Sequence, residues 1–125
     1  MEQPTNRIII AEDEGFLSKE LSDKLEKAGF TVATAKNGVE AMKLMNEERP
    51  SLLLLDLMMP EKSGFEVLSE MKSNEGLKEI PVIIISNLGQ ESDVQRGMQL
   101  GAVDYIVKAR ITMKEVVEKV KAHIH

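Results

Sequence analysis

The run Leu52-Leu53-Leu54-Leu55 lies near the middle of a 125-residue chain and stops at an acidic residue, Asp56. Two further unbroken apolar runs have the same length, Ile8-Ile9-Ile10-Ala11 and Val82-Ile83-Ile84-Ile85. Unbroken runs of this kind are typical of strands that are covered on both faces, as in a parallel sheet. The three runs therefore predict the three central strands of an α/β sheet.

Around these runs, apolar residues recur at helical spacing. The first helix is predicted by Leu17, Leu21, Leu25 and Ala28, and Gly29 ends it. The other helices are expected over residues 37–48, 64–73, 90–100 and 113–124. In the last of these, Thr112 and Glu115 have the spacing of a capping box. Two weaker strands, over residues 30–35 and 104–108, have the mixed character of sheet edges.

Five strands alternating with five helices predict a flavodoxin-like (βα)5 fold of the α/β class, with right-handed crossovers. We expect a parallel five-stranded sheet in the order 2-1-3-4-5 with helices on both faces. A chain of 125 residues is too short for two ordinary domains. Residues 1–125 are therefore expected to form one domain.

Composition excludes several classes of function. The net charge of −5 argues against direct nucleic-acid binding through phosphate neutralisation, and the absence of cysteine excludes disulfides and thiolate metal sites. No apolar run exceeds four residues, so no membrane span is expected. The start of the chain, Met1 to Pro4, has no secretory pattern. We therefore expect a cytoplasmic protein.

Polar residues follow the predicted strands at the edge where an open α/β sheet binds its ligands. Glu12 and Asp13 follow the first strand, and Asp56, Ser86 and Lys108 end the third, fourth and fifth. Neighbouring strands would bring Asp13 and Asp56 to one cation, and the long side chain of Lys108 can reach the same point. All-oxygen ligation with few protein ligands suits Mg²⁺. Such a set of groups is typical of phosphoryl transfer, with a carboxylate as the nucleophile.

The sequence resembles the receiver domain of two-component response regulators (CheY-like) over nearly its whole length. The first two matching motifs are Ile8-Ile9-Ile10-Ala11-Glu12-Asp13-Glu14 and Leu55-Asp56-Leu57-Met58-Met59-Pro60, the latter followed by Gly64. The other two are Ile85-Ser86 and Gly101-Ala102-Val103-Asp104-Tyr105-Ile106-Val107-Lys108. All four occur in the order, and at the strand ends, that the resemblance requires.

The resemblance implies a signalling switch rather than a metabolic enzyme. Asp56 would accept a phosphoryl group from the phosphohistidine of a sensor histidine kinase or a phosphotransfer protein. The domain would catalyse only that transfer and its own dephosphorylation. The implied Mg²⁺ ligands are Glu12, Asp13, Asp56 and the backbone carbonyl of Met58.

Three further roles are implied by the same resemblance. Lys108 would pair with the phosphoryl oxygens. Ser86 would move its hydroxyl onto the phosphoryl group, and Tyr105 would turn inward. The fourth helix, fifth strand and fifth helix would then present a changed surface to a downstream protein.

Two positions depart from the family pattern. Ala109 follows Lys108 where the family usually has proline, and we expect a trans peptide bond there because a cis bond before a non-proline residue costs roughly 3 kcal/mol. Asn87 stands where the family usually has a small residue, and we expect it to screen the acyl phosphate from water. His123 and His125, at the end of the chain, are expected to be solvated.

Three alternatives remain. A degenerate receiver would act as a constitutive protein-interaction module. An aspartyl phosphatase would usually carry a second acid where this chain has Met58. A flavin carrier would need a phosphate-binding loop where Glu12-Asp13-Glu14 would repel phosphate.

Overall fold

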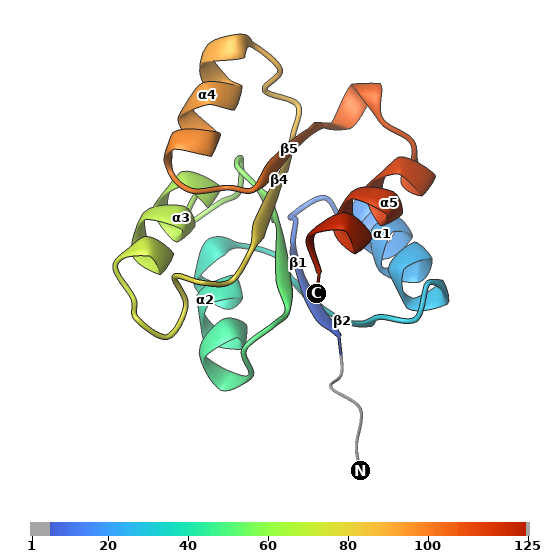
Figure 1. The fold of residues 1–125 in the computed structure, drawn as a ribbon, viewed down its shortest axis with the longest axis horizontal. Coiled ribbons are helices and arrows are strands. Elements are labelled where there is room, and N and C mark those ends of the chain that lie inside the picture. The colour runs from blue at the N-terminus through green and yellow to red at the C-terminus, as the bar shows by residue number, and fades with distance from the viewer. Residues whose placement is uncertain (1–5, 125) are drawn as a thin grey trace.

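In the computed structural model, which describes residues 6–124, five parallel strands form one sheet in the order β2-β1-β3-β4-β5 (Figure 1). The strands are β1 (Arg7–Ala11), β2 (Thr31–Ala35), β3 (Leu52–Asp56), β4 (Val82–Ser86) and β5 (Asp104–Val107). The helices are α1 (Gly15–Lys27), α2 (Gly38–Glu47), α3 (Gly64–Lys72), α4 (Glu91–Gln99) and α5 (Met113–His123), with a short 3₁₀ turn, η1 (Lys108–Arg110). The predicted flavodoxin-like (βα)5 fold and its strand order are confirmed.

The sheet separates two hydrophobic layers. Helices α2, α3 and α4 cover one face, and α1 and α5 cover the other (Figure 1). Successive residues of β3 point to opposite layers, with Leu53 and Leu55 in the first and Leu52 and Leu54 in the second. All four are fully buried, which is why this strand reads as an unbroken apolar run.

The element boundaries follow local chemistry. Gly29 ends α1 with φ +102°, a conformation that favours glycine. The capping box expected at Thr112 and Glu115 is present and begins α5. The strand expected over residues 104–108 is wrong at its last residue, because Lys108 already belongs to the 3₁₀ turn η1. No cis peptide bond occurs within residues 6–124, so the trans bond expected between Lys108 and Ala109 is confirmed.

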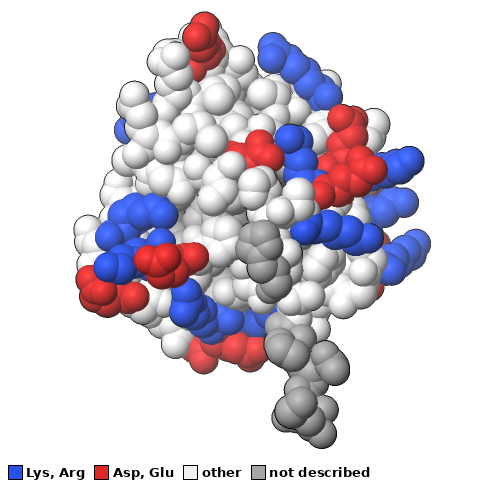
Figure 2. Space-filling model, viewed as in Figure 1, with Lys and Arg blue, Asp and Glu red and all other residues white. Residues whose placement is uncertain are grey.

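None of the described helices is long and apolar enough to cross a membrane. On the face seen in Figure 2, basic side chains are interspersed with acidic ones rather than gathered in one patch. The expectations for Met1 to Pro4 and for His125 lie outside the described residues.

Candidate functional site

Three acidic residues meet at the carboxyl edge of β1 and β3. These strands are neighbours in which Ala11 lies opposite Leu55, so Glu12 and Asp13 leave β1 beside Asp56. One carboxylate oxygen from each of the three acids lies within 4.8 Å of the others. The structure therefore brings together the acids that strand order predicts to meet.

A glycine shapes the loop below the acids. The N–H of Gly64 donates to the carbonyl of Leu57 at 3.0 Å. A Cβ at this position would collide with the backbone carbonyl of Asp56. The loop after β3 can fold back against the strand end only because residue 64 has no side chain.

Asp56 is buried, with only 2% of its surface exposed. Its Oδ1 accepts a hydrogen bond from the N–H of Met58 at 3.1 Å. Burial raises the pKa of Asp56 to about 6, and repulsion from Glu12 adds to this, while the Met58 N–H and the Lys108 ammonium oppose it. A buried carboxylate whose ionisation is disfavoured in this way is typical of a functional site.

Lys108 reaches both buried acids from η1. Its Nζ lies 2.6 Å from Oε1 of Glu12 and 3.3 Å from Oδ2 of Asp56. Burial alone would lower the pKa of Lys108, but the two carboxylates outweigh that effect and raise it. The ammonium is thus held in its charged form between two acids.

Both carboxylate oxygens of Glu12 make contacts within the site. Its Oε2 accepts the N–H of Glu14 at 2.9 Å. Its Oε1 is buried and contacts the Lys108 ammonium at 2.6 Å. Three carboxylates that each bring an oxygen within 4.8 Å of the others fit a hard divalent cation such as Mg²⁺.

The remaining site residues lie around this centre. Ser86 is fully buried at the end of β4, and its Oγ accepts the N–H of Leu88 at 3.1 Å. Tyr105 is half-buried on β5, and its hydroxyl donates to the carbonyl of Leu88. The side chains of Met58 and Asn87 are exposed at the same edge. The structure therefore brings Glu12, Asp13, Asp56 and Lys108 together, while Ser86 and Tyr105 both contact the loop between β4 and α4.

Two contacts could not be predicted from the sequence. One is the ion pair between Lys108 and Glu12, which is closer than the expected approach to Asp56. The other joins β5 to α5, where Oδ2 of Asp104 lies 3.2 Å from both Lys119 Nζ and His123 Nε2. The expectation that His123 is solvated is therefore wrong, because α5 brings its ring to Asp104. The helical spacing of 119 and 123 was the only available signal.

Comparison with known proteins identifies the family to which the chain is similar. A family model described as the response regulator receiver domain matches residues 8–121. The chain is 34% identical over 116 residues to a probable transcriptional regulator, ycf27, of Guillardia theta, covering 93% of this chain and 44% of that protein. It is 34% identical over 117 residues to the polar-differentiation response regulator DivK of Brucella anthropi, covering 94% of each chain. The chain thus spans less than half of the first relative and nearly all of the second.

A solved structure of a response regulator has the same fold as this chain. The Mn²⁺-bound form of response regulator Rcp1 superposes with a TM-score of 0.80 at 30% identity, covering 94% of this chain and 90% of that one.

Proposed function

We propose that this chain, which belongs to the response regulator receiver domain family, is a signalling switch that accepts a phosphoryl group on Asp56. The observation that carries the proposal is a buried carboxylate at the end of β3 with Lys108 Nζ 3.3 Å from its Oδ2 and two further acids beside it. Membership of the family makes the chain a signalling domain rather than a metabolic enzyme. The finer assignment of residues is our proposal.

The donor is the phosphohistidine of a sensor histidine kinase or a phosphotransfer protein. An oxygen of the Asp56 carboxylate attacks phosphorus, and the P–N bond to the donor imidazole breaks. The electron pair returns to the ring nitrogen, which takes up a proton. Lys108 offsets negative charge on the phosphoryl oxygens. Hydrolysis later transfers the phosphoryl group from Asp56 to water and releases inorganic phosphate.

Glu12, Asp13, Asp56 and the backbone carbonyl of Met58 would hold Mg²⁺. The three acids, each with a carboxylate oxygen within 4.8 Å of the others, support this assignment, and so does the Mn²⁺ bound by the similar protein Rcp1. The ion would offset the negative charge that gathers on the acceptor and the phosphoryl oxygens. The protein supplies the acids that would orient the ion, and it supplies Lys108 beside those acids.

Phosphorylation would act on the loop between β4 and α4. The hydroxyl of Ser86 now accepts from Leu88 N–H, and that of Tyr105 donates to Leu88 carbonyl. New phosphoryl oxygens would attract the Ser86 hydroxyl. The loop would then move and release Tyr105 to turn inward. The surface of α4, β5 and α5 would change for a downstream protein target.

We further propose that residues 1–125 form one receiver domain that works in the cytoplasm without contacting nucleic acid or membrane itself. The net charge of −5 supports the absence of a direct nucleic-acid contact.

The test is the intact mass of the protein after incubation with acetyl phosphate and Mg²⁺, for the wild type and for Asp56→Asn. We expect a gain of one phosphoryl group in the wild type alone. A gain in both proteins would mean that Asp56 is not the acceptor. If neither protein gains mass, incubation with a phosphorylated histidine kinase decides between a receiver that requires its kinase and a constitutive interaction module.

A further inference from the structure

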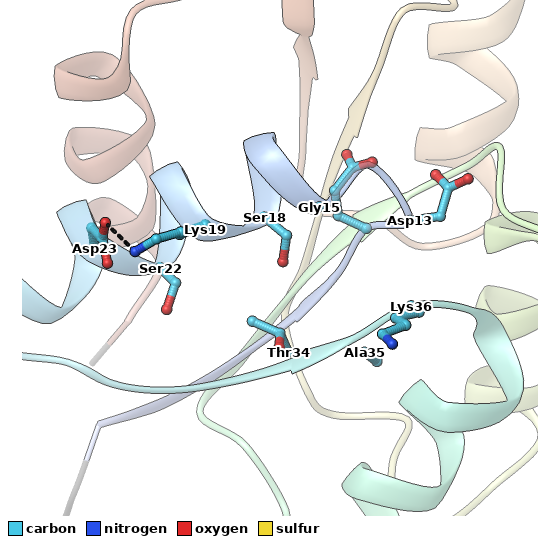
Figure 3. A pocket seen from close by; sticks show the side chains of 10 residues that line it. Asp13, Gly15, Ser18, Lys19, Ser22, Asp23, Thr34, Ala35 and Lys36 are labelled. Atoms are coloured by element: carbon cyan, nitrogen blue, oxygen red, sulfur yellow. Dashed lines mark hydrogen bonds and ion pairs between the residues drawn. The ribbon is translucent and has the colours of Figure 1, made fainter.

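A pocket of about 410 Å³ lies between α1 and the end of β2 (Figure 3). Its volume falls within the range of about 300–1,000 Å³ that is typical of small-molecule sites. Three hydroxyl-bearing residues line it, Ser18 and Ser22 from α1 and Thr34 from β2. In Figure 3 the two serine side chains point from the helix toward the strand that carries Thr34. The pocket is therefore lined by hydroxyl groups on two opposing walls.

Ser18 is the most informative of these residues. Only 8% of its surface is exposed. A serine inside a helix commonly returns its hydroxyl to the carbonyl one turn earlier. Here the carbonyl of Glu14 accepts the Ser18 backbone N–H at 3.0 Å, and within residues 6–124 the Ser18 hydroxyl forms no hydrogen bond. A hydroxyl of a buried residue that faces a pocket without a protein partner offers a donor and an acceptor to a ligand.

Three acids and two lysines line the pocket. Lys19 and Asp23 form an ion pair at 3.3 Å on one rim. Asp13 and Lys36 lie toward the other end. Glu12, the third acid of the lining, is paired with the Lys108 ammonium at 2.6 Å, so the charges around the pocket give no strong preference for an anion or a cation. The hydroxyls, which both donate and accept, are then the groups that select the ligand.

We propose that this pocket binds a small neutral molecule rich in hydroxyl groups, of the sugar or polyol class. Ring or chain hydroxyls would exchange hydrogen bonds with Ser18, Ser22 and Thr34. Because Glu12 and Asp13 also line the pocket, a bound molecule would change the affinity of the acids for Mg²⁺, and Mg²⁺ would change its affinity in return. This coupling rests on the proposed function, whereas the binding itself does not.

The test is a titration followed by amide ¹H–¹⁵N spectra in metal-free buffer, with D-glucose, trehalose and myo-inositol as probes. We expect saturable shifts at the amides of Ser18, Ser22 and Thr34 with at least one probe. Ser18→Ala should bind about fivefold more weakly, which corresponds to the loss of one hydrogen bond. Alanine is a better helix former than serine, so this variant keeps α1 intact. Ser69→Ala, an exposed serine on α3, should bind like the wild type.

Three results would overturn the proposal. The first is the absence of saturable shifts at the three amides with every probe up to its solubility limit. The second is equal affinity of the wild type and Ser18→Ala. The third is much tighter binding of glucose 6-phosphate than of glucose, which would make the pocket an anion site. Each result is independent of acetyl phosphate labelling, so failure of this proposal is distinguishable from failure of the acceptor assignment.

Discussion

Ionisation of the buried Asp56 carboxyl is expected to lower the free energy of unfolding. Its pKa of about 6, against an ordinary 3.8, means that ionisation is disfavoured in the folded state. As pH rises from about 4 to about 6, the unfolded chain loses this proton first, and the wild type loses stability. Above about pH 6, the loss of stability caused by ionisation of Asp56 no longer grows. Asp56→Asn cannot ionise and should be more stable at pH 7 without Mg²⁺, by up to about 3 kcal/mol.

Urea unfolding in metal-free buffer between pH 4 and pH 8 measures this difference. The gain of Asp56→Asn over the wild type should grow across the window and stay constant above it. The exposed Asp23, changed to Asn, is the control and should show no such growth. A gain that is the same at every pH would refute the role given to ionisation.

Gly64 allows the loop after β3 to pack against the backbone of Asp56. A methyl group at this position collides with the backbone carbonyl of Asp56. We expect Gly64→Ala to cost about 1–3 kcal/mol of stability and to slow labelling by acetyl phosphate. Gly15→Ala is the matched control, because a Cβ there meets nothing within 4 Å. If urea unfolding finds both variants equally stable, the tight approach does not constrain the loop.

At the scale of elements, β5 and α5 are joined through Asp104. Its Oδ2 lies 3.2 Å from Lys119 and His123, and its Oδ1 accepts the N–H of Tyr105 at 2.8 Å. Burial alone would raise the pKa of Asp104, but these partners outweigh it and lower the pKa. The Asp104 carboxylate therefore contributes its full stabilisation of the fold above the ordinary pKa of an aspartate. That stabilisation is lost as the pH falls through the lowered pKa of Asp104 in the folded protein.

We expect Asp104→Asn to lose about 1 kcal/mol at pH 7. The loss should shrink as the pH falls below about 4. Thermal or urea unfolding at several pH values measures it, and the exposed Glu118 on the same helix, changed to Gln, serves as the control. A loss that persists unchanged at pH 2 would show that packing, not the carboxylate charge, joins the two elements.

The loop between β4 and α4 sets the lifetime of the phosphorylated form in our proposal. Asn87 is exposed directly after the buried Ser86. A side chain of this length can cover the acyl phosphate, so Asn87→Ala should shorten the half-life of the phosphorylated protein several-fold. Decay of the added mass after removal of acetyl phosphate measures this. Ser92→Ala, on the exposed side of α4, should decay like the wild type. An unchanged or longer half-life in Asn87→Ala contradicts screening.

At the scale of the whole molecule, the fold could be predicted from apolar runs because each strand's burial depends on its own residues. Leu52 to Leu55 need cover on both faces wherever the strand lies. Contacts between elements depend on side-chain reach and helix rotation, which no local pattern contains. Lys108 bends into η1 and meets Glu12 for this reason, and α5 carries His123 to Asp104. The acids and the lysine could be predicted to meet, but not which acid the lysine contacts most closely.

The proposed cation site links β1, β3 and η1, so its occupancy should stabilise the whole fold rather than one loop. A ligand that binds only the folded state adds about 1.4 kcal/mol at a free concentration tenfold above its Kd. We expect Mg²⁺ at constant ionic strength to raise the Tm of the wild type. Asp13→Asn removes an exposed carboxylate of the trio and should reduce that rise, whereas Asp23→Asn should keep it. Calorimetric scans with and without Mg²⁺ measure the effect. An equal rise in all three proteins would place the ion elsewhere, and no rise in any of them would remove Mg²⁺ from the proposed mechanism.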